Sequence, residues 1–430
     1  MYRKTIEALR KWKSNPHRKP LVVDGARQVG KTWLINRFGE EEYEGVAYVN
    51  LEKDPQASDI FNGSFDPERI IARLSLHLSM EIIPGKTLIF VDEAQQNPRA
   101  LTALKYFKED APEYHIVVAG SLLGIAIHEG DSFPVGKTNH ITINPLSFEE
   151  FLIALGKEQL ARSLSQREYD LLRPFHDELI ELYKTYCVVG GMPEVVQSYL
   201  DDKSMLHVRE VQVDILQSYE HDFSKYADKF TTPKIVEIFN IIPSALAKEN
   251  KKFMFGMIKE SARAREYDAA LLWLVRAGVA TRVNRVAKVA QPLSAYLDYG
   301  AFKLFYADIG LLSCKSGLHP ETIYNEESFE EFKGALAEQF VLQELRARGV
   351  EPFYYSADDS MSEIDFVVQN KAEIVPIEIK SGKNLRARSL DRLLDSHPSM
   401  RAVKISMLPY KENQQITNVP IYGAATIIND

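Results

Sequence analysis

The chain has 430 residues, of which 45% are hydrophobic and 26% charged, and its formal net charge is -8. This length exceeds what one hydrophobic core usually organises, so we expect two to four domains. The acidic balance excludes a chain that binds nucleic acid through its overall charge and leaves any such contact to a local basic patch. The cysteines form no pairing motif, the N-terminus has no apolar signal core, and no apolar run is long enough for a membrane span. We therefore expect a cytoplasmic protein without a membrane partner.

The first strong pattern is a strand, a glycine-rich loop and a helix. A short amphipathic helix is predicted over 2–13, an apolar run follows at 21–23, and D-G-A-R-Q-V-G-K-T stands at 24–32 before helix-compatible residues at 33–38. The loop fits Walker A, G-x-x-x-x-G-K-[ST], whose backbone N–H groups surround phosphate oxygens at the start of a helix. In this interpretation Lys31 contacts the β and γ phosphates of ATP, and the Thr32 hydroxyl ligates Mg²⁺. The other predicted nucleotide-binding residues are Gly25, Ala26, Arg27, Gln28, Val29 and Gly30. The alternative is a chance glycine-rich turn.

A second pattern ends at two adjacent carboxylates. Strands are predicted at 46–51 and 87–92 with a helix over 66–80 between them, and the second strand, T-L-I-F-V-D, runs directly into Glu93. Buried parallel strands are continuous apolar runs whose carboxyl ends open on the ligand crevice, so this segment fits Walker B. Asp92 is then expected to hold Mg²⁺ through water, and Glu93 to polarise the attacking water. The alternative is a pair of acids that simply ends a strand.

Two more strands complete the N-terminal pattern, at 115–121 and 140–144. Ser121 ends the first of them, where it either contacts the γ-phosphate or the water, the role called sensor 1, or is an ordinary strand-end cap. Strands that alternate with helices over 1–150 indicate an α/β domain with a parallel, doubly wound sheet.

The acidic pair after Walker B resembles AAA+-type ATPases. Several stretches are similar to one bacterial and archaeal family, in which G-A-R-Q-V-G-K-T, F-V-D-E-A-Q, A-G-S-L-L, N-P-L-S-F-E-E-F and V-G-G-M-P-E-V-V recur in this order before a domain of unknown function called DUF4143. The resemblance covers nearly the whole chain and implies an ATP-binding domain, a helical region and a DUF4143 portion over roughly 205–385. Many relatives carry an Arg in the segment before the last core strand. Here that position is Lys137, which weakens any arginine-finger role because Lys offers a point charge rather than a planar fork.

The middle of the chain is predicted to be mostly helical. Between helices, Gly190 and Gly191 permit close backbone approach; this turn is either a lid over the nucleotide or a plain interhelical turn, and we favour the turn. Helical patterns at 234–248 and 262–277, followed by an alternating segment at 279–286, resemble a winged helix. Arg263 and Arg265 near the start of its second helix would then face DNA. The alternative is a winged helix that serves only protein packing. We interpret the mostly apolar run at 302–312 as core.

The last hundred residues carry a third constellation. Glu338 lies on the apolar face of a helix predicted over 332–348, Asp365 on an alternating strand at 362–369, and Glu378 and Lys380 on one face of a strand at 377–380. This order matches the PD-(D/E)XK nuclease signature. Two carboxylates, Asp365 and Glu378, would hold Mg²⁺, with Lys380 and Glu338 beside them, and the metal would activate water. The nearby basic residues that could meet a phosphate backbone are Lys383, Arg386, Arg388 and Arg392. The alternatives are charges on a solvated face, or a nuclease-like domain that binds without cutting.

These observations predict an α/β protein of four parts. They are a P-loop AAA-type domain at 1–150, a helical lid or linker at 151–230, a winged-helix-like domain at 231–315 and a nuclease-like domain at 316–430. The expected function is ATP binding and Mg²⁺-dependent hydrolysis, with cofactors ATP and Mg²⁺ and with DNA contacts through the last two domains. In one interpretation ATP drives a DNA-directed machine that cuts; in the other it sets a slow regulatory or defence switch. Self-association is left open.

Overall fold

The computed structural model describes residues 1–125, 136–248, 250–324, 330–357, 362–382 and 388–428. The chain divides into two compact units. The first contains residues Met1–Asn144 together with the short segment Arg276–Val279, and the second contains Pro145–Val275 and Ala280–Asp430.

The first unit is built on a parallel sheet. Within the described residues it has five strands in the order β2-β3-β4-β1-β5, and each neighbouring pair is parallel. The strands are β1 (Leu21–Asp24), β2 (Gly45–Asn50), β3 (Thr87–Asp92), β4 (His115–Ala119) and β5 (Asn139–Thr142). Every residue of β3 and β4 is buried, which is the continuous apolar pattern expected for a parallel strand covered on both faces. The prediction of a parallel α/β sheet is therefore confirmed.

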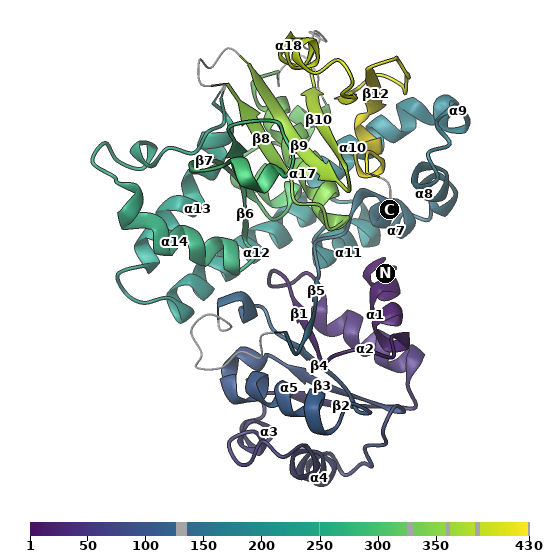
Figure 1. The fold of residues 1–430 in the computed structure, drawn as a ribbon, viewed down its shortest axis with the longest axis vertical. Coiled ribbons are helices and arrows are strands. Elements are labelled where there is room, and N and C mark those ends of the chain that lie inside the picture. Colours follow the sequence, from purple (N-terminus) through teal and green to yellow (C-terminus); the bar gives the residue numbers. More distant parts are fainter. Residues whose placement is uncertain (126–135, 249, 325–329, 358–361, 383–387, 429–430) are drawn as a thin grey trace. The chain divides into compact units, whose positions relative to one another are not determined.

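Helices cover both faces of this sheet (Figure 1). They are α1 (Thr5–Ser14), α2 (Lys31–Glu42), α3 (Pro55–Ile60), α4 (Pro67–Leu78) and α5 (Pro98–Asp110). The last three begin with the same device, an Asp or Asn that caps the helix followed by Pro at the first helical position. The cap oxygen accepts an unpaired backbone N–H, and Pro fits where no N–H is needed, so the sequence itself sets where these helices start.

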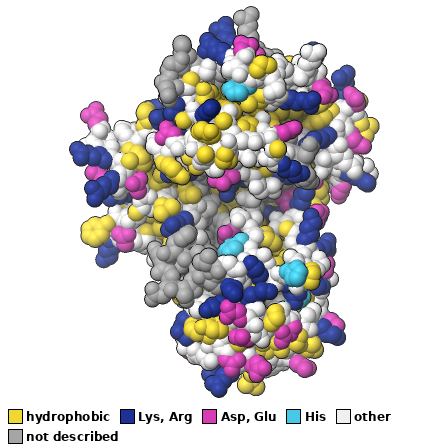
Figure 2. Space-filling view, in the orientation of Figure 1, with side chains coloured by type: hydrophobic (Ala, Val, Ile, Leu, Met, Phe, Trp, Pro, Cys, Tyr) yellow, Lys and Arg dark blue, Asp and Glu magenta, His cyan; other side chains and the backbone are white. Residues whose placement is uncertain are grey.

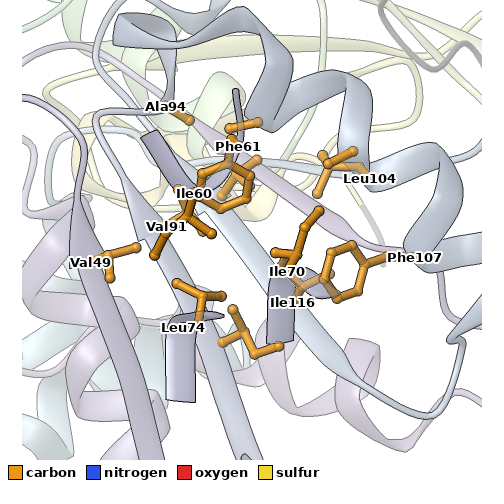
Figure 3. Packing of buried hydrophobic residues seen from close by; sticks show 14 of the residues in the cluster. Val49, Ile60, Phe61, Ile70, Leu74, Val91, Ala94, Leu104, Phe107 and Ile116 are labelled. Carbon is orange, nitrogen blue, oxygen red and sulfur yellow. The ribbon is translucent and has the colours of Figure 1, made fainter. Parts of the chain in front are cut away.

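One face of the sheet carries a large apolar core (Figure 3). Val49, Val91 and Ile116 project from the strands toward Ile70 and other side chains of α3, α4 and α5. Each large side chain removed from water contributes about 1.5–3 kcal/mol, so this layer fixes the strand ends that carry polar residues. On the opposite face Trp12 of α1 and Phe38 of α2 lie with ring centroids 6.4 Å apart.

The second unit begins with a helical region. Its helices are α7 (Phe148–Ala154), α8 (Glu158–Ser165), α9 (Tyr169–Leu172), α10 (His176–Val189), α11 (Pro193–Asp202), α12 (Met205–Tyr226), α13 (Thr232–Leu246), α14 (Ala264–Arg276), α15 (Ile309–Lys315), α16 (Pro320–Tyr324), α17 (Glu330–Ala347) and α18 (Arg388–Ser396). Phe148, Tyr186 and Phe340 pack together edge to face, which joins α7, α10 and α17. Among the described residues, no helix is both long and apolar enough to cross a bilayer.

The glycine pair after α10 closes tightly on the start of α15. Gly191 N donates to Asp308 Oδ2 over 2.6 Å, and Gly190 has φ 74°. A Cβ at Gly190 would lie 2.2 Å from Asp308 Oδ1, so a side chain there would collide with the carboxylate. The glycines are required for this close approach inside the second unit.

A mixed sheet forms the rest of the second unit. Within the described residues it has seven strands in the order β12-β11-β10-β9-β8-β6-β7. They are β6 (Ala280–Val286), β7 (Leu297–Tyr306), β8 (Phe353–Ser356), β9 (Glu363–Asn370), β10 (Glu373–Lys380), β11 (Ala402–Ser406) and β12 (Ile416–Pro420). Pro376 is tolerated within β10 because pairing with β11 begins one residue later, at Ile377.

The hairpin of β6 and β7 extends this sheet. The two strands are antiparallel, and β6 pairs in parallel with β8 through Arg285 and Val286. The strand predicted as a wing is thus hydrogen-bonded to the sheet that carries Asp365 and Glu378. A separate winged-helix domain is not confirmed.

Candidate functional site

The glycine-rich loop lies between β1 and α2 of the first unit. Gly25 has φ 137°, and a Cβ there would lie 2.2 Å from the Ile143 carbonyl oxygen. Gly30 caps α2 with φ 89°, a left-handed conformation that suits glycine. Gln28 also has a positive φ, 68°, although it carries a side chain. The loop is therefore a strained turn at the N-terminus of a helix, where backbone N–H groups and the helix dipole favour an anion.

Lys31 is buried at the first position of α2, with 7% of its surface exposed. Its Nζ donates to the carbonyl oxygens of Gly25 and Ala26, both at 2.8 Å. Burial lowers the pKa of Lys31 to about 8, although Glu93 and Asp92 oppose the shift. The ammonium is thus held by the loop itself. To contact phosphate oxygens it would exchange these carbonyl contacts for contacts with the nucleotide.

Thr32 and Asp92 bring the two predicted Walker segments together. The Thr32 hydroxyl donates to Asp92 Oδ2 over 2.8 Å, and Tyr48 donates to the same oxygen over 3.3 Å. Asp92 Oδ1 accepts from the Glu93 backbone N–H at 3.0 Å. Because Asp92 is only 2% exposed, these donors hold its carboxylate in one orientation.

Glu93 and Gln95 form the next layer of the site. Glu93 has φ 50°, and its Oε2 accepts from Gln95 Nε2 over 2.5 Å. Gln95 Oε1 packs against Gly120, where a Cβ would lie 2.0 Å away. Ser121 follows Gly120 at the carboxyl end of β4, on the same edge of the sheet as Glu93. The sensor role of Ser121 stays a prediction.

The residues present fit a nucleotide with its magnesium ion. Among the described residues of the first unit, three buried side-chain oxygens lack a hydrogen-bond partner: Asp24 Oδ1, Gln28 Oε1 and Gln95 Oε1. They come from the end of β1, the loop and the turn after β3, so each borders the loop or the Walker B strand. A hydroxyl and a carboxylate, as in Thr32 and Asp92, are the oxygen donors that Mg²⁺ takes. Sequence reasoning missed Gln95 and Tyr48, although Gln95 ends the F-V-D-E-A-Q stretch that is similar to the family.

The residue considered for an arginine-finger role lies away from this layer. Lys137 Nζ pairs with Glu109 Oε1 at 3.1 Å, and both side chains are exposed. A surface pair of this kind contributes little, about 0–1 kcal/mol.

The C-terminal constellation converges in the second unit. The antiparallel pairing of β9 with β10 ends with Ile377 opposite Phe366, and Glu378 and Asp365 are the next residues on the two strands. Asp365 Oδ2 accepts from the Ile379 backbone N–H at 2.7 Å, and Lys380 Nζ pairs with Glu378 Oε1 at 2.7 Å. Glu378 is 5% exposed, and its Oε2 has no partner among the described residues.

Glu338 reaches the same cluster from α17, but its oxygens are engaged by lysines. Lys303 of β7 contacts Glu338 Oε2 at 3.2 Å, and Lys251 contacts Glu338 Oε1. Lys303 also pairs with Glu363 Oε1 at 2.7 Å. Neither lysine was predicted from the sequence, because Lys303 stands in the run F-K-L-F-Y that we interpreted as core.

The pKa values in this cluster follow from burial and from neighbouring charges. Burial raises the pKa of Asp365 well above its ordinary value, and Glu338 and Glu378 raise it further. Burial would also raise the pKa of Glu338, but Lys251 and Lys303 outweigh it and hold that pKa below the ordinary value. Burial opposes charge on Lys303, yet Glu338 and Glu363 raise its pKa above that of a free lysine. The buried lysine is therefore charged.

The carboxylates of this cluster do not fit a divalent cation as they stand. In the described part of the chain, no group of three or more His, Cys, Asp or Glu side chains could hold a metal ion. Metal binding by Asp365 and Glu378 stays a prediction.

The basic residues singled out for DNA do not gather at one described site. Arg263 and Arg265 are exposed at the start of α14, and Arg388 and Arg392 are exposed on α18. Lys383 and Arg386 lie outside the described residues. On the face shown in Figure 2, Lys and Arg side chains are interspersed with Asp and Glu across each unit. DNA binding therefore stays a prediction.

Family models match three successive parts of the chain. Residues 17–152 match an AAA domain, residues 180–322 match a domain of unknown function, DUF8612, and residues 333–426 match DUF4143. The P-loop ATPase domain and the DUF4143 domain implied by the family resemblance are thus found. The DUF4143 match begins and ends further along the chain than the range of 205–385 implied by the resemblance. A nuclease-like character of that domain is not part of the match.

No curated protein matches this chain. Solved structures with a related arrangement include the Walker-type ATPase PABY2304 of Pyrococcus abyssi, at 16% identity and a TM-score of 0.46, covering 73% of this chain and 94% of that one. The ORC1 protein of Aeropyrum pernix in complex with DNA has 12% identity and a TM-score of 0.29, covering 74% and 93%. Cdc6p of Pyrobaculum aerophilum has 12% identity and a TM-score of 0.26, covering 76% and 94%. Likenesses at these scores carry no argument about function.

Proposed function

We propose that this chain binds ATP and hydrolyses it with Mg²⁺ at the carboxyl edge of the parallel sheet. The observation that carries the proposal is the hydrogen bond from Thr32 to Asp92, because it joins the phosphate loop to the Walker B strand. The match of residues 17–152 to an AAA domain supports it.

Each residue has a distinct task in this proposal. The loop from Gly25 to Gly30 offers backbone N–H groups to the phosphates, and Lys31 adds a positive charge. Thr32 and Asp92 would hold the magnesium ion, which supplies charge neutralisation on the phosphate oxygens. Glu93, held by Gln95, orients and deprotonates the attacking water. Ser121 is the candidate contact for the γ-phosphate.

Thermal unfolding with and without nucleotide tests the binding step. A ligand that binds only the native state raises its stability, so millimolar Mg-ATP should raise the Tm of the wild type. Lys31→Ala should abolish the shift. Lys53→Ala changes an exposed lysine of the same unit and should keep it. A wild-type Tm that ignores Mg-ATP overturns the proposal.

ATP turnover could serve one of two functions, which we call the machine proposal and the switch proposal. In the machine proposal, DNA stimulates turnover and the C-terminal domain cuts. In the switch proposal, turnover is slow and indifferent to DNA. The pairing of both Glu338 oxygens with lysines favours the switch, because Glu338 is then unavailable to a nuclease metal. Steady-state ATP turnover with and without duplex and single-stranded DNA separates the two, and a large stimulation by DNA favours the machine.

A further inference from the structure

The side chains of the charged cluster on the C-terminal sheet come from two regions of the chain. Its acids, Glu338, Asp365 and Glu378, lie in the region that matches DUF4143. Two of its lysines, Lys251 and Lys303, lie in the preceding region that matches DUF8612. The β6–β7 hairpin brings Lys303 across because β6 pairs with β8 of the C-terminal sheet.

The two lysines occupy different positions around Glu338. Lys303 is 0% exposed, and its Nζ lies 5.1 Å from the centre of the Tyr354 ring. Lys251 lies beside the first turns of α17, where Gly334 makes room: a Cβ there would lie 3.3 Å from Lys251 Nζ. Moving an ammonium from water into such a site is unfavourable, so a buried lysine is stable there only when carboxylates compensate for its lost hydration.

Most of the carboxylate oxygens of the cluster already have a donor or a cation as partner. Both Glu338 oxygens face lysines, Asp365 Oδ2 accepts a backbone N–H, and Glu378 Oε1 faces Lys380. Glu378 Oε2 is buried without a partner in the described residues. A cation entering beside it would also meet the positive charges of the lysines, and like charges repel strongly where water is excluded.

We propose that Lys251 and Lys303 are built-in cations that balance the carboxylates in place of a divalent metal ion. The cluster then holds no tightly bound Mg²⁺ or Mn²⁺ in the intact chain, and it becomes a metal site when a lysine is removed. This proposal does not depend on ATP hydrolysis. It also gives a role to the ion pairs that Lys251 and Lys303 form with Glu338. Through these pairs, the DUF8612 region prevents the acids of the DUF4143 region from binding a metal ion.

Binding of Mn²⁺, measured by the loss of the free-ion signal in electron paramagnetic resonance, tests this on the full chain without nucleotide. Lys303→Met and Lys251→Met should each gain one Mn²⁺ site, at least roughly tenfold tighter than any the wild type shows at the cluster. Adding Glu378→Gln to either variant should remove the gained site. Lys315→Met is the matched control, because Lys315 forms a partly buried pair with Glu220 at 2.8 Å outside the cluster; it should bind as the wild type does.

Two results would overturn the proposal. One is a wild-type Mn²⁺ site that disappears in Asp365→Asn or Glu378→Gln, since the cluster would then already hold metal. The other is a folded lysine variant that gains no site. Lys303→Met leaves Glu338 and Glu363 short of a buried cation and could unfold the domain. Lys251 is more exposed, with 16% of its side chain accessible, so Lys251→Met and the wild-type arm decide the question in that case.

Discussion

Thr32 and Asp92 are sixty positions apart in sequence, yet the hydroxyl of one donates to the carboxylate of the other over 2.8 Å. In the proposed site, Asp92 would therefore orient a magnesium ligand as well as face the ion itself. Asp92→Asn keeps the shape of the side chain but removes its charge. We expect the affinity for Mg-ATP to fall about 10–100-fold, as for other changes that disturb the orientation of metal ligands. Affinity for ATP in EDTA should change little, and isothermal titration calorimetry in the two conditions checks this. Equal losses with and without magnesium would contradict the assignment.

Glu93 is predicted to act on water rather than on nucleotide. Glu93→Gln preserves the contact with Gln95 in shape while removing the base, so turnover should fall about 100- to 10,000-fold. Binding of Mg-ATP should remain within about threefold of the wild type, because the change affects the chemical step. Single-turnover hydrolysis and equilibrium binding measure the two separately. If both fall together, Glu93 positions the nucleotide instead.

Lys31 should make ATP binding depend on pH. Its pKa of about 8 in the free chain would rise beside phosphate oxygens, so binding takes up a proton above that pH. Affinity should therefore be highest below pH 8 and fall by up to about tenfold per pH unit above it. Calorimetry at pH 8.5 in buffers of different ionisation enthalpy should reveal the proton uptake. Lys31→Met should bind more weakly and show no uptake; uptake that survives in this variant would assign the proton to another group.

Asp308 gives a pH dependence of stability with the opposite sign from most carboxylates. Burial raises its pKa from 3.8 to about 6, although the hydrogen bond from Gly191 and others oppose the shift. Because the pKa is higher in the folded state, Asp308 makes its whole contribution to the free energy of unfolding below about pH 4. That contribution is lost as the pH rises to about 6, and the free energy of unfolding no longer changes with this group above that pH. The loss is on the order of 3 kcal/mol from the size of the shift. Chemical unfolding of wild type and Asp308→Asn should be measured from pH 4 to 7. The free energy of unfolding of the wild type should decrease relative to that of the variant as the pH rises. Parallel curves would show that Asp308 does not titrate there.

Gly25→Ala tests the shape of the phosphate loop without touching a charged group. A methyl group would collide with the Ile143 carbonyl at 2.2 Å, and φ 137° is a conformation that alanine rarely adopts. The loop must then move, so Mg-ATP should no longer raise the Tm. Gly85→Ala is a control in the same unit, because Gly85 also has positive φ, but nothing lies within 4 Å of its Cβ position. It should lose some stability and keep the Tm response; a retained response in Gly25→Ala would contradict the proposed loop.

The proposed nucleotide site was predictable because its signals are local. Gly25, Gly30 and Lys31 lie in one loop, and Asp92 ends an unbroken apolar strand, so short-range patterns locate them. The parallel sheet follows from the alternation of strands and helices. Gln95 and Tyr48 were not predicted because their place in the site depends on side-chain contacts that the folded structure forms. Gln95 donates to Glu93, and Tyr48 donates to Asp92 on the neighbouring strand.

The C-terminal cluster was predictable only in part. Alternation placed Asp365 and Glu378 on the polar face of their strands, and the register brings them together. Lys303 could not be assigned, because its partners depend on the pairing of β6 with β8, whose residues are about seventy positions apart. The one clue was a lysine in an otherwise apolar strand, since a buried charge requires a partner.

The short segment Arg276–Val279 belongs to the first unit, although the residues on both sides of it belong to the second. Gly278 has φ 70°, and a Cβ there would lie 3.1 Å from the backbone nitrogen of Ala26 in the phosphate loop. The polypeptide thus passes between the units at residues 144–145, 275–276 and 279–280. A fragment ending near residue 150 would contain every Walker residue and still lack a neighbour of the loop. In the intact chain, the residue that approaches Ala26 is therefore joined along the backbone to the end of α14 on one side and to the start of β6 on the other.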